Sequence, residues 1–290
     1  MPSGGIEVIV VTGSYSSSER QIISQNGVRL ITLPKTVFVS EAHNVGTLAA
    51  LGEYVLFLDD DNIVAPDAIS HLAVTLQQRQ EAVLVGPVMY YGSAPSRIWC
   101  AGVSRSRIFM MTRFRTRLPD GPPPRIGSED FPNCFMVRWK DFIAVDGFDT
   151  ERFPQHMAEG DFARRLRLST KGSVYCVTSA KVWHFIGTSL ARRLHVQDRH
   201  RAYWVGRSRT VFTAMYGTRL QWVVYVALAQ WVLFAVYIAA IGVRTRSDRG
   251  QLITAYARGI GSGLKHGFAE RRSSGSRAPH IEGRKDGPAQ

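Results

Sequence analysis

The chain has 290 residues, of which 45% are apolar; this suits one large α/β domain with an appendage and excludes a chain that is disordered throughout. The formal net charge of +13 favours polyanionic partners, which include nucleic acid, anionic lipid headgroups and phosphorylated substrates. The three cysteines are far apart and form no CxxC pair. Their number and spacing argue against a disulfide framework or a structural zinc site and fit a reducing, cytosolic compartment.

The first hundred residues alternate short apolar runs with helical patterns. The apolar runs predict strands at 6–11, 28–33, 54–58 and 82–85, and the helical patterns predict helices at 19–25, 40–52 and 68–80. Ser40 is the expected N-cap of the second helix. Strands that alternate with helices at this spacing indicate an α/β fold with a doubly wound, mainly parallel sheet.

The next hundred residues are less regular. Five arginines between Arg105 and Arg117, followed by three consecutive prolines, predict a long basic loop. Beyond it we expect strands at 133–137, 174–177 and 181–183 and helices at 140–145 and 161–169.

An acidic triplet, Asp59-Asp60-Asp61, follows the strand at 54–58 directly. The carboxyl ends of strands are where open α/β sheets bind their ligands, and carboxylate oxygens are the ligands that Mg²⁺ and Mn²⁺ prefer. The alternative is a solvated acidic turn before the next helix. Because three adjacent carboxylates repel one another, a bound cation is the better explanation.

Three further residues are candidates for chemistry. Glu159 and Asp161 lie at the start of a predicted helix, where either could act as a general base or could merely complement the helix dipole. Asp161 also has Arg165 four residues on, at ion-pair spacing. His184 ends a predicted strand, where a histidine is either a core residue or a third metal ligand beside the acidic triplet.

The segment from Trp222 to Val243 contains no charged residue and is long enough to cross a bilayer. The alternative is a helix buried in the core. Arginines flank the segment on both sides, so they leave its orientation undecided. The tail after Glu270 is rich in Ser, Gly and Arg, and we expect it to be disordered.

Eight segments follow one another along the chain in a recognisable order: Asn44–Gly46, Ala50–Tyr54, Phe57–Asp61, Cys134–Arg138, Val145–Asp149, Glu159–Arg165, His184 and Arg201–Arg209. Each matches a motif of the family 2 glycosyltransferases of the GT-A fold, which the chain resembles over about residues 6–217.

The resemblance implies a GT-A domain at 1–217, with a donor part to about residue 100 and an acceptor part after it. A membrane-associated helical region at 218–269 and a disordered basic tail at 270–290 complete the expected organisation.

For the site, the resemblance implies a divalent cation, Mg²⁺ or Mn²⁺, held by Asp59 and Asp61 with His184. Thr12, Asn44 and the triplet, including Asp60, would bind the nucleotide-sugar donor. By motif order Glu159 takes the place of the family's catalytic base and is our first choice, with Asp161 second.

The implied function is inverting transfer of one sugar to a lipid-linked or glycan acceptor, as in the synthesis of cell-envelope polysaccharide. The implied location is the cytoplasmic face of a membrane, with the protein associated with it or crossing it once. The Gln-x-x-Arg-Trp motif of processive synthases is missing after Gln197, which favours single addition over polymerisation. The arginines of the basic loop and Arg192-Arg193 are candidates for holding phosphates, or else form a solvated surface near anionic lipid.

The start of the chain departs from the family pattern. The strand at 6–11 matches the family's second strand, with Thr12 in place of an aspartate that contacts the base, so a central strand of the donor half has no counterpart. We therefore expect either that residues 8–11 pair directly with Tyr54–Leu58, or that an open slot lies beside the acidic triplet.

The same departure supports a second hypothesis, a catalytically impaired remnant that acts as a membrane-associated binding protein. Nucleic-acid binding is the third hypothesis and has only the net charge in its favour, so we expect no nucleic-acid partner.

Overall fold

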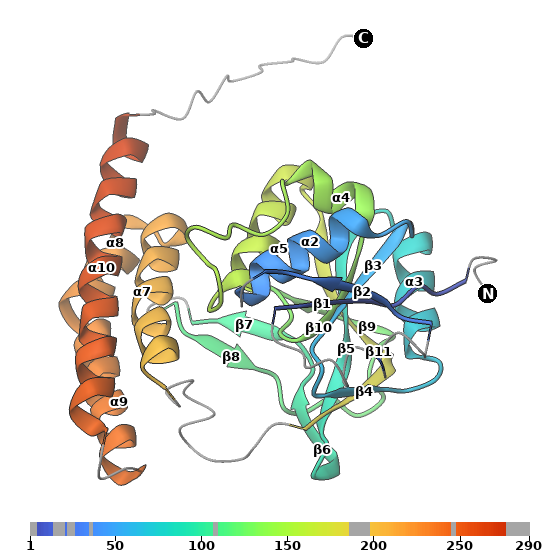
Figure 1. Ribbon diagram of the computed structural model, residues 1–290, viewed down its shortest axis with the longest axis horizontal. Helices are drawn as coiled ribbons and strands as arrows, with labels where there is room; N and C mark the ends of the chain where they lie inside the picture. The colour runs from blue at the N-terminus through green and yellow to red at the C-terminus, as the bar shows by residue number, and fades with distance from the viewer. Residues whose placement is uncertain are drawn as a thin grey trace, which may run out of the picture.

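The computed structural model describes residues 5–13, 21, 27–34, 37–106, 110–185, 198–244 and 248–276. Apart from residue 21, the helix predicted at 19–25 lies outside the described residues, as do Arg192, Arg193 and Gln197. The molecule consists of a sheet domain and a group of long C-terminal helices along one side of it (Figure 1).

A seven-stranded sheet forms the centre of the α/β domain. Its main path is β3 (Tyr54–Leu58), β10 (Cys134–Arg138), β5 (Ala82–Tyr91), β11 (Ser173–His184) and β4 (Asn62–Val64), with β6 (Ala94–Cys100) beside β5 and β9 (Arg125–Ser128) beside β11. Strands β5 and β11 are parallel, and β10 is antiparallel to both of its neighbours, so β3, β5 and β11 run in one direction. The predicted strands at 174–177 and 181–183 are one strand, β11, with an irregularity between them.

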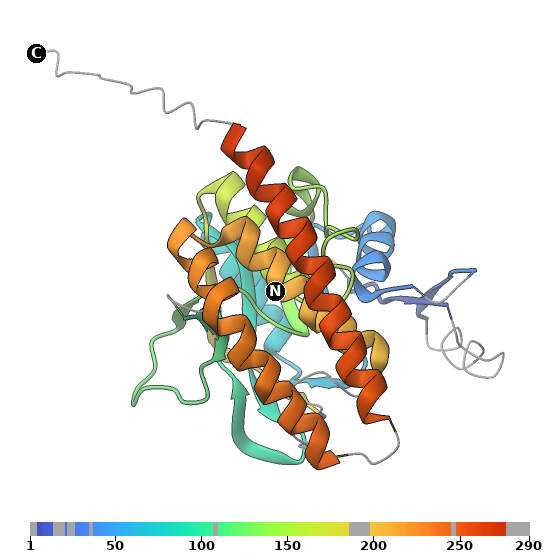
Figure 2. The same ribbon diagram turned by 90° about the vertical axis from the view of Figure 1, so that its left-hand side faces the viewer.

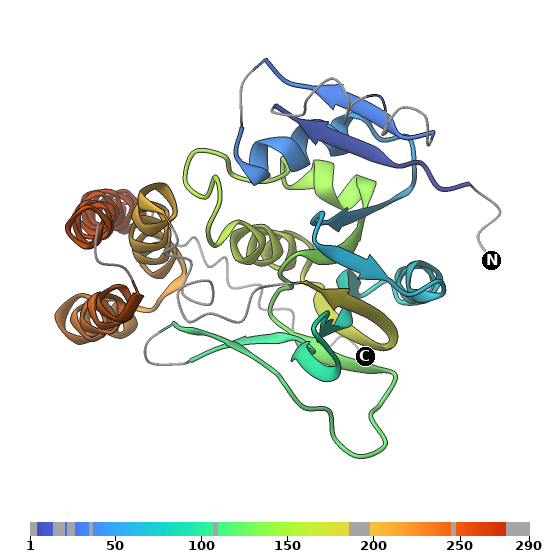
Figure 3. The ribbon, with the colours of Figure 1, turned by 60° about the horizontal axis from the view of Figure 1, so that its bottom comes forward.

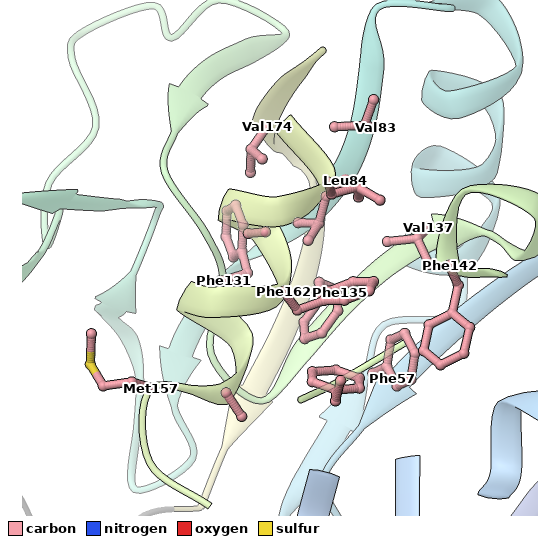
Figure 4. Close-up of a cluster of buried hydrophobic side chains, with 14 of the residues drawn as sticks. Phe57, Val83, Leu84, Phe131, Phe135, Val137, Phe142, Met157, Phe162 and Val174 are labelled. Atoms are coloured by element: carbon pink, nitrogen blue, oxygen red, sulfur yellow. The ribbon is translucent and has the colours of Figure 1, made fainter. Parts of the chain in front are cut away.

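Both faces of this sheet are covered, because successive side chains of β10 enter different cores. Phe135 and Val137 belong to the larger core, whereas Met136 between them belongs to the second one. Figure 4 shows the larger core, in which phenylalanines from several elements, including Phe135, gather. This alternation has the period of two that a sheet with helices on both faces requires.

In the described part of the chain, four helices complete the layers of the domain. They are α2 (Val39–Ala49), α3 (Ala68–Gln78), α4 (Trp139–Ala144) and α5 (Ala158–Thr170). Phe142 of α4 and Phe162 of α5 pack into the larger core, and Leu72 and Leu76 of α3 pack into the second. Ser40 is not the N-cap of α2, because the helix begins at Val39; its buried hydroxyl instead donates a hydrogen bond to the carbonyl of Phe153, at 2.7 Å.

The first two strands form a sheet of their own. Strand β1 (Ile9–Thr12) pairs in parallel with β2 (Arg29–Thr32), and among the described residues neither pairs with β3. Figure 3 shows this pair as a separate layer at one edge of the molecule. A cleft lined by residues 5–11 on one side and 52–61 on the other separates β1 from β3. The second of the two expectations for the start of the chain, an open slot beside the acidic triplet, is therefore confirmed.

The basic stretch after β6 is not one long loop. It contains a hairpin of β7 (Val103–Arg105) and β8 (Thr112–Phe114), and then the edge strand β9. The sequence of this segment favours a loop because its arginines and prolines show no apolar alternation, and in the structure all three β8 residues are exposed.

The C-terminal helices are α7 (Arg199–Tyr216), α8 (Arg219–Val224), η1 (Tyr225–Ala229), α9 (Gln230–Arg244) and α10 (Arg249–Ser276). Figure 2 shows them packed side by side against the sheet domain. Helices α7 and α10 approach closely, since Gly259 lies against the carbonyl of Tyr203 and Gly263 against that of Arg207. Helix α10 continues past Glu270, which pairs with Arg152 at 2.8 Å, so residues 270–276 are helical and not part of a disordered tail.

The continuous helical stretch Arg219–Gly242 is long and apolar enough to cross a membrane, and 39% of its most apolar window is buried against the protein. The buried positions follow a helical period, as Trp222, Tyr225, Ala229, Leu233 and Tyr237 show. The other face of the stretch exposes large apolar side chains: Leu220, Val223, Leu228, Trp231, Val232, Val236 and Ile238. One face therefore belongs to a helical core, and the other is uncharged and uncovered by the described residues.

Candidate active site

The acidic triplet follows the end of β3 and is held in a fixed turn. The backbone N–H of Asp59 donates to the carbonyl of Asn133 at 3.0 Å, and the N–H of Phe185 donates to the carbonyl of Asp61 at 2.8 Å. The Asn62 amide donates to the Asp59 carbonyl and to an Asp61 carboxylate oxygen, at 3.1 and 3.2 Å. The turn is thus tied to β10 and β11, and its carboxylates face the cleft.

His184 meets the triplet from the end of β11. Its Nε2 atom lies 3.1 Å from Asp61 Oδ2 and 2.9 Å from the side-chain amide nitrogen of Asn133, and the ring is 2% exposed. The Trp99 ring stands edge-on to it at 4.3 Å. When Nε2 carries the hydrogen it donates to Asp61, and when it does not it accepts from the Asn133 amide; a cation held by Asp61 would take the place of that amide at the lone pair.

The donor set around Asp61 fits a hard divalent cation. Burial, followed by repulsion from Asp61, raises the pKa of Asp59 to about 7, and a nearby positive charge would reverse this effect. In the described parts of the chain no three His, Cys, Asp or Glu side chains already form a metal-binding group. Asp61 and His184 are in contact, and Asp59 as a third ligand stays a prediction. Such a partial set is normal for Mg²⁺, which takes its other ligands from water and substrate phosphates.

Glu159 lies on the first turn of α5, after Met157, whose backbone is left-handed with φ 65°. Its side chain lines the same cleft as the triplet. Burial raises the pKa of Glu159 to about 8; Asp59 and Asp130 raise it further, and Arg105 opposes them. A carboxyl group with a pKa near neutrality in a cleft has the properties of a general base.

Asp161, two residues further on, is fully buried and does not line the cleft. One carboxylate oxygen accepts from Arg165 at 2.8 Å, and the other accepts from the Tyr216 hydroxyl at 2.6 Å. Both oxygens are used to hold α5 against α7. The geometry therefore favours Glu159 over Asp161 as the base.

The Arg105 side chain packs against the start of α5. Its guanidinium is already paired with carboxylates and is not available to bind a phosphate. Its guanidinium pairs with Asp130 and, at 3.4 Å, with Glu129, and it lies over the Phe212 ring. Gly160 leaves room for this pair, because a Cβ atom there would clash with the Arg105 guanidinium. The sequence did not reveal this use of Arg105, since its acidic partners are 24 and 25 residues away.

Two residues expected to bind the donor do not line the cleft. The Asn44 amide is used by the Phe148 backbone, to which it donates at 2.9 Å and from which it accepts at 2.8 Å. Thr12 ends β1 and is 8% exposed. In contrast, His43, next to Asn44, lines the cleft between the Phe57 and Phe148 rings, and burial lowers its pKa to about 4.

The cleft that joins these groups has a volume of about 2170 Å³. It extends from the slot beside β1, past the triplet and Glu159, to Arg201 and Arg209 of α7. Arg201 lies close enough to lower the pKa of Asp59. Sequence reasoning singled out the stretch around Arg201 only by resemblance, and it did not identify Asn133, whose left-handed backbone, with φ 61°, precedes β10.

The chain is similar to known proteins in part of its sequence and in its fold. Residues 2–137 match the model of the family described as Glycosyl transferase family 2. The solved structure of GalNAc-T7 with UDP, GalNAc and Mn²⁺ is similar, with a TM-score of 0.52 and 12% identity over 80% of this chain and 52% of that one. The chain thus spans about half the length of GalNAc-T7.

Two other solved structures match with lower scores. They are TarS residues 1–349 of S. aureus (TM-score 0.44, 15% identity, 94% of this chain and 83% of that one) and A197 from STIV (TM-score 0.40, 12% identity, 63% and 87%). No curated protein matches the chain. Residues 2–137 of the chain are thus similar to glycosyltransferase family 2, and the fold of the chain is that of the GT-A enzymes.

Proposed function

We propose that the protein is an inverting, metal-dependent glycosyltransferase that moves one sugar from a nucleotide-sugar donor to a membrane-associated acceptor. The observation that carries this proposal is a single cleft lined by Asp59–Asp61, His184 and Glu159. It brings a cation-binding corner and a base of raised pKa to one cavity, although 98 residues separate Asp61 from Glu159 in the sequence.

Each group has one role in the proposed reaction. Asp61 and His184, with Asp59, would hold Mg²⁺ or Mn²⁺, which as a Lewis acid neutralises the charge of the leaving nucleoside diphosphate. Glu159 removes the proton from the acceptor hydroxyl, whose oxygen attacks the anomeric carbon from the face opposite the leaving group. Arg201 adds a positive charge on the triplet's side of the cleft.

The acceptor is proposed to be lipid-linked or a glycan at a membrane surface. The exposed face of residues 220–242 is apolar and lacks charge, and the net charge of +13 favours an anionic leaflet. Because the other face of this stretch packs on α7 and α10, contact along the bilayer surface accounts for the exposed side chains as well as a single crossing does.

The test is an assay of released nucleoside diphosphate with a panel of UDP-, GDP- and dTDP-sugars, with and without Mn²⁺. We expect release with at least one donor, its loss in excess chelator, and its loss in Asp61→Ala, whose half-exposed side chain contributes little to packing. Full activity in chelator would contradict the metal-dependent mechanism.

A second candidate is supported by the slot between β1 and β3: a binding protein with an impaired donor site. Calorimetric titration of each nucleotide sugar with Mn²⁺ separates the two. An enzyme binds at least one donor, and the impaired protein binds none.

A further inference from the structure

Arg209 of α7 is a cation with neutral partners. Its Nη2 atom donates to the Tyr237 hydroxyl at 3.3 Å, and its guanidinium lies over the Tyr237 ring at 5.7 Å. Five other arginines of the described chain have a carboxylate within 4.0 Å: Arg105, Arg138, Arg152, Arg165 and Arg201. Among the described residues no carboxylate lies that close to Arg209, although its side chain is half-buried.

The open side of Arg209 faces the catalytic cleft. Arg209 and Tyr237 line that cleft together with Trp204 and Val205, so a cation and a hydroxyl lie beside an apolar wall. Tyr237 comes from α9, whose opposite face carries the exposed apolar side chains. This end of the cleft therefore lies between Glu159 and the surface proposed to touch a membrane.

Arg209 is separated from the donor corner. Arg201, which lines the cleft together with the triplet, lies two helical turns earlier on α7 than Arg209. Eight residues of helix correspond to about 12 Å. A phosphate bound at Arg209 is thus distinct from the donor diphosphate expected at the triplet.

A half-buried guanidinium without an anion has lost hydration that only neutral groups replace. A phosphate oxygen pair matches the guanidinium fork, and the Tyr237 hydroxyl can donate a further hydrogen bond. We propose that Arg209, with Tyr237, binds a phosphate group of the acceptor. That the phosphate belongs to an acceptor rests on the proposed function. That a phosphate binds at Arg209 rests on the contacts of this side chain.

The test measures binding separately from transfer. The probes are phosphatidylcholine vesicles with and without phosphatidate, as the lipid arm, and glycerol 3-phosphate, as the soluble arm. We expect Arg209→Gln to lower the affinity for one of these phosphates about ten- to hundredfold, the usual effect of losing a charge-assisted hydrogen bond. The arm that responds identifies whether the phosphate belongs to a lipid or to a soluble molecule.

Arg258→Gln is the matched control, because it removes the same charge from an exposed position on α10. It should leave phosphate binding unchanged; an equal loss in both variants would show general charge attraction and overturn the proposal. Arg209→Lys keeps the charge but not the fork, and it provides the test if Arg209→Gln does not fold.

Binding of donor with Mn²⁺ should stay unchanged in the Arg209 variants, while KM for an acceptor rises. If the protein transfers no sugar at all, the vesicle and glycerol phosphate arms still decide the role of Arg209. If transfer occurs and phosphate binding is the same in Arg209→Gln as in the native chain, the proposed function stands and this inference fails.

Discussion

Glu159 and Asp161 lie two residues apart on α5, yet their surroundings differ. Glu159 faces the cleft, and burial raises its pKa to about 8. A general base must be deprotonated, so kcat/KM should rise with pH and level off above about pH 8. A cation near Asp59 would offset the repulsion from that carboxylate and move this midpoint to lower pH. Glu159→Gln should lower turnover by about 10²- to 10⁴-fold and remove the rise.

Donor affinity, measured by calorimetry, is the control for Glu159→Gln and should barely change. A pH–rate profile of Glu159→Gln that keeps the native midpoint would assign the base to another group. A larger loss of turnover in folded Asp161→Asn than in Glu159→Gln would exchange the two roles.

Asp161 should matter for stability first. Its buried carboxylate joins Arg165 of α5 to Tyr216 of α7. Tyr216→Phe removes one hydrogen bond to a charged group and should lower the free energy of unfolding by about 1.5–3 kcal/mol. Asp161→Asn, which breaks the buried ion pair, should cost about 3–5 kcal/mol. Denaturant titration measures both, and losses below 0.5 kcal/mol in both variants would contradict this role.

At the scale of elements, the crossing of α7 and α10 offers a paired test. A Cβ atom at Gly259 would clash with the Tyr203 carbonyl, whereas one at Gly261 meets nothing within 4 Å. Gly259→Ala should therefore destabilise the protein by about 1–3 kcal/mol. Gly261→Ala, in the same helix, should be neutral or stabilising by up to about 1 kcal/mol. Thermal unfolding of the two variants compares them, and equal midpoints would show that the helices do not cross there.

Several apolar elements could be predicted from the sequence, although the strand predicted at 82–85 continues to Tyr91 in β5 and β6 was not predicted. Tyr54–Leu58 was predicted with the bounds that β3 has, and the predicted helix at 140–145 is within one residue of α4. Strands β8 and β9 could not be predicted from the sequence, because their residues are mostly exposed or charged. The antiparallel direction of β10 could not be predicted either, because pairing between distant segments leaves no local pattern in the sequence.

The same limit applied to the site. Asp59–Asp61 and Glu159 could be singled out because carboxylates at the ends of elements are a local pattern. Asn44 was assigned to the donor although it binds the Phe148 backbone, 104 residues away. The neutral environment of Arg209 likewise depends on Tyr237, which lies 28 residues further on.

For the whole molecule, the exposed face of Arg219–Gly242 is the proposed membrane contact. Replacing Leu228, Trp231 and Val232 together by Gln should reduce binding to anionic vesicles by at least about tenfold, because each buried apolar side chain contributes about 1.5–3 kcal/mol. Leu48→Gln on α2, where Leu48 is similarly exposed, is the matched control. Co-sedimentation with vesicles measures both, and equal binding of the triple variant would exclude this face as the contact.

The separate β1–β2 layer affects how the molecule opens. Among the described residues, its links to the rest are side-chain contacts such as Glu7 to the Leu51 and Gly52 amides and the packing of α2, and no strand-to-strand hydrogen bonds join it to β3. Segments with few such links open as units of low stability, and their amides exchange before those of the core.

Hydrogen exchange followed by mass spectrometry should therefore show two populations of amides. Residues 9–12 and 29–32 should lose protection well before residues 82–91 of β5, at denaturant concentrations where the core stays closed. Uniform exchange of both regions would mean that the slot is no boundary between cooperative units. If the two populations are seen, a ligand that bridges β1 and β3 should slow amide exchange in β1 and β2. Exchange in the core strands, which are already protected, should not change. The protein would then report occupation of its cleft through the protection of its first two strands.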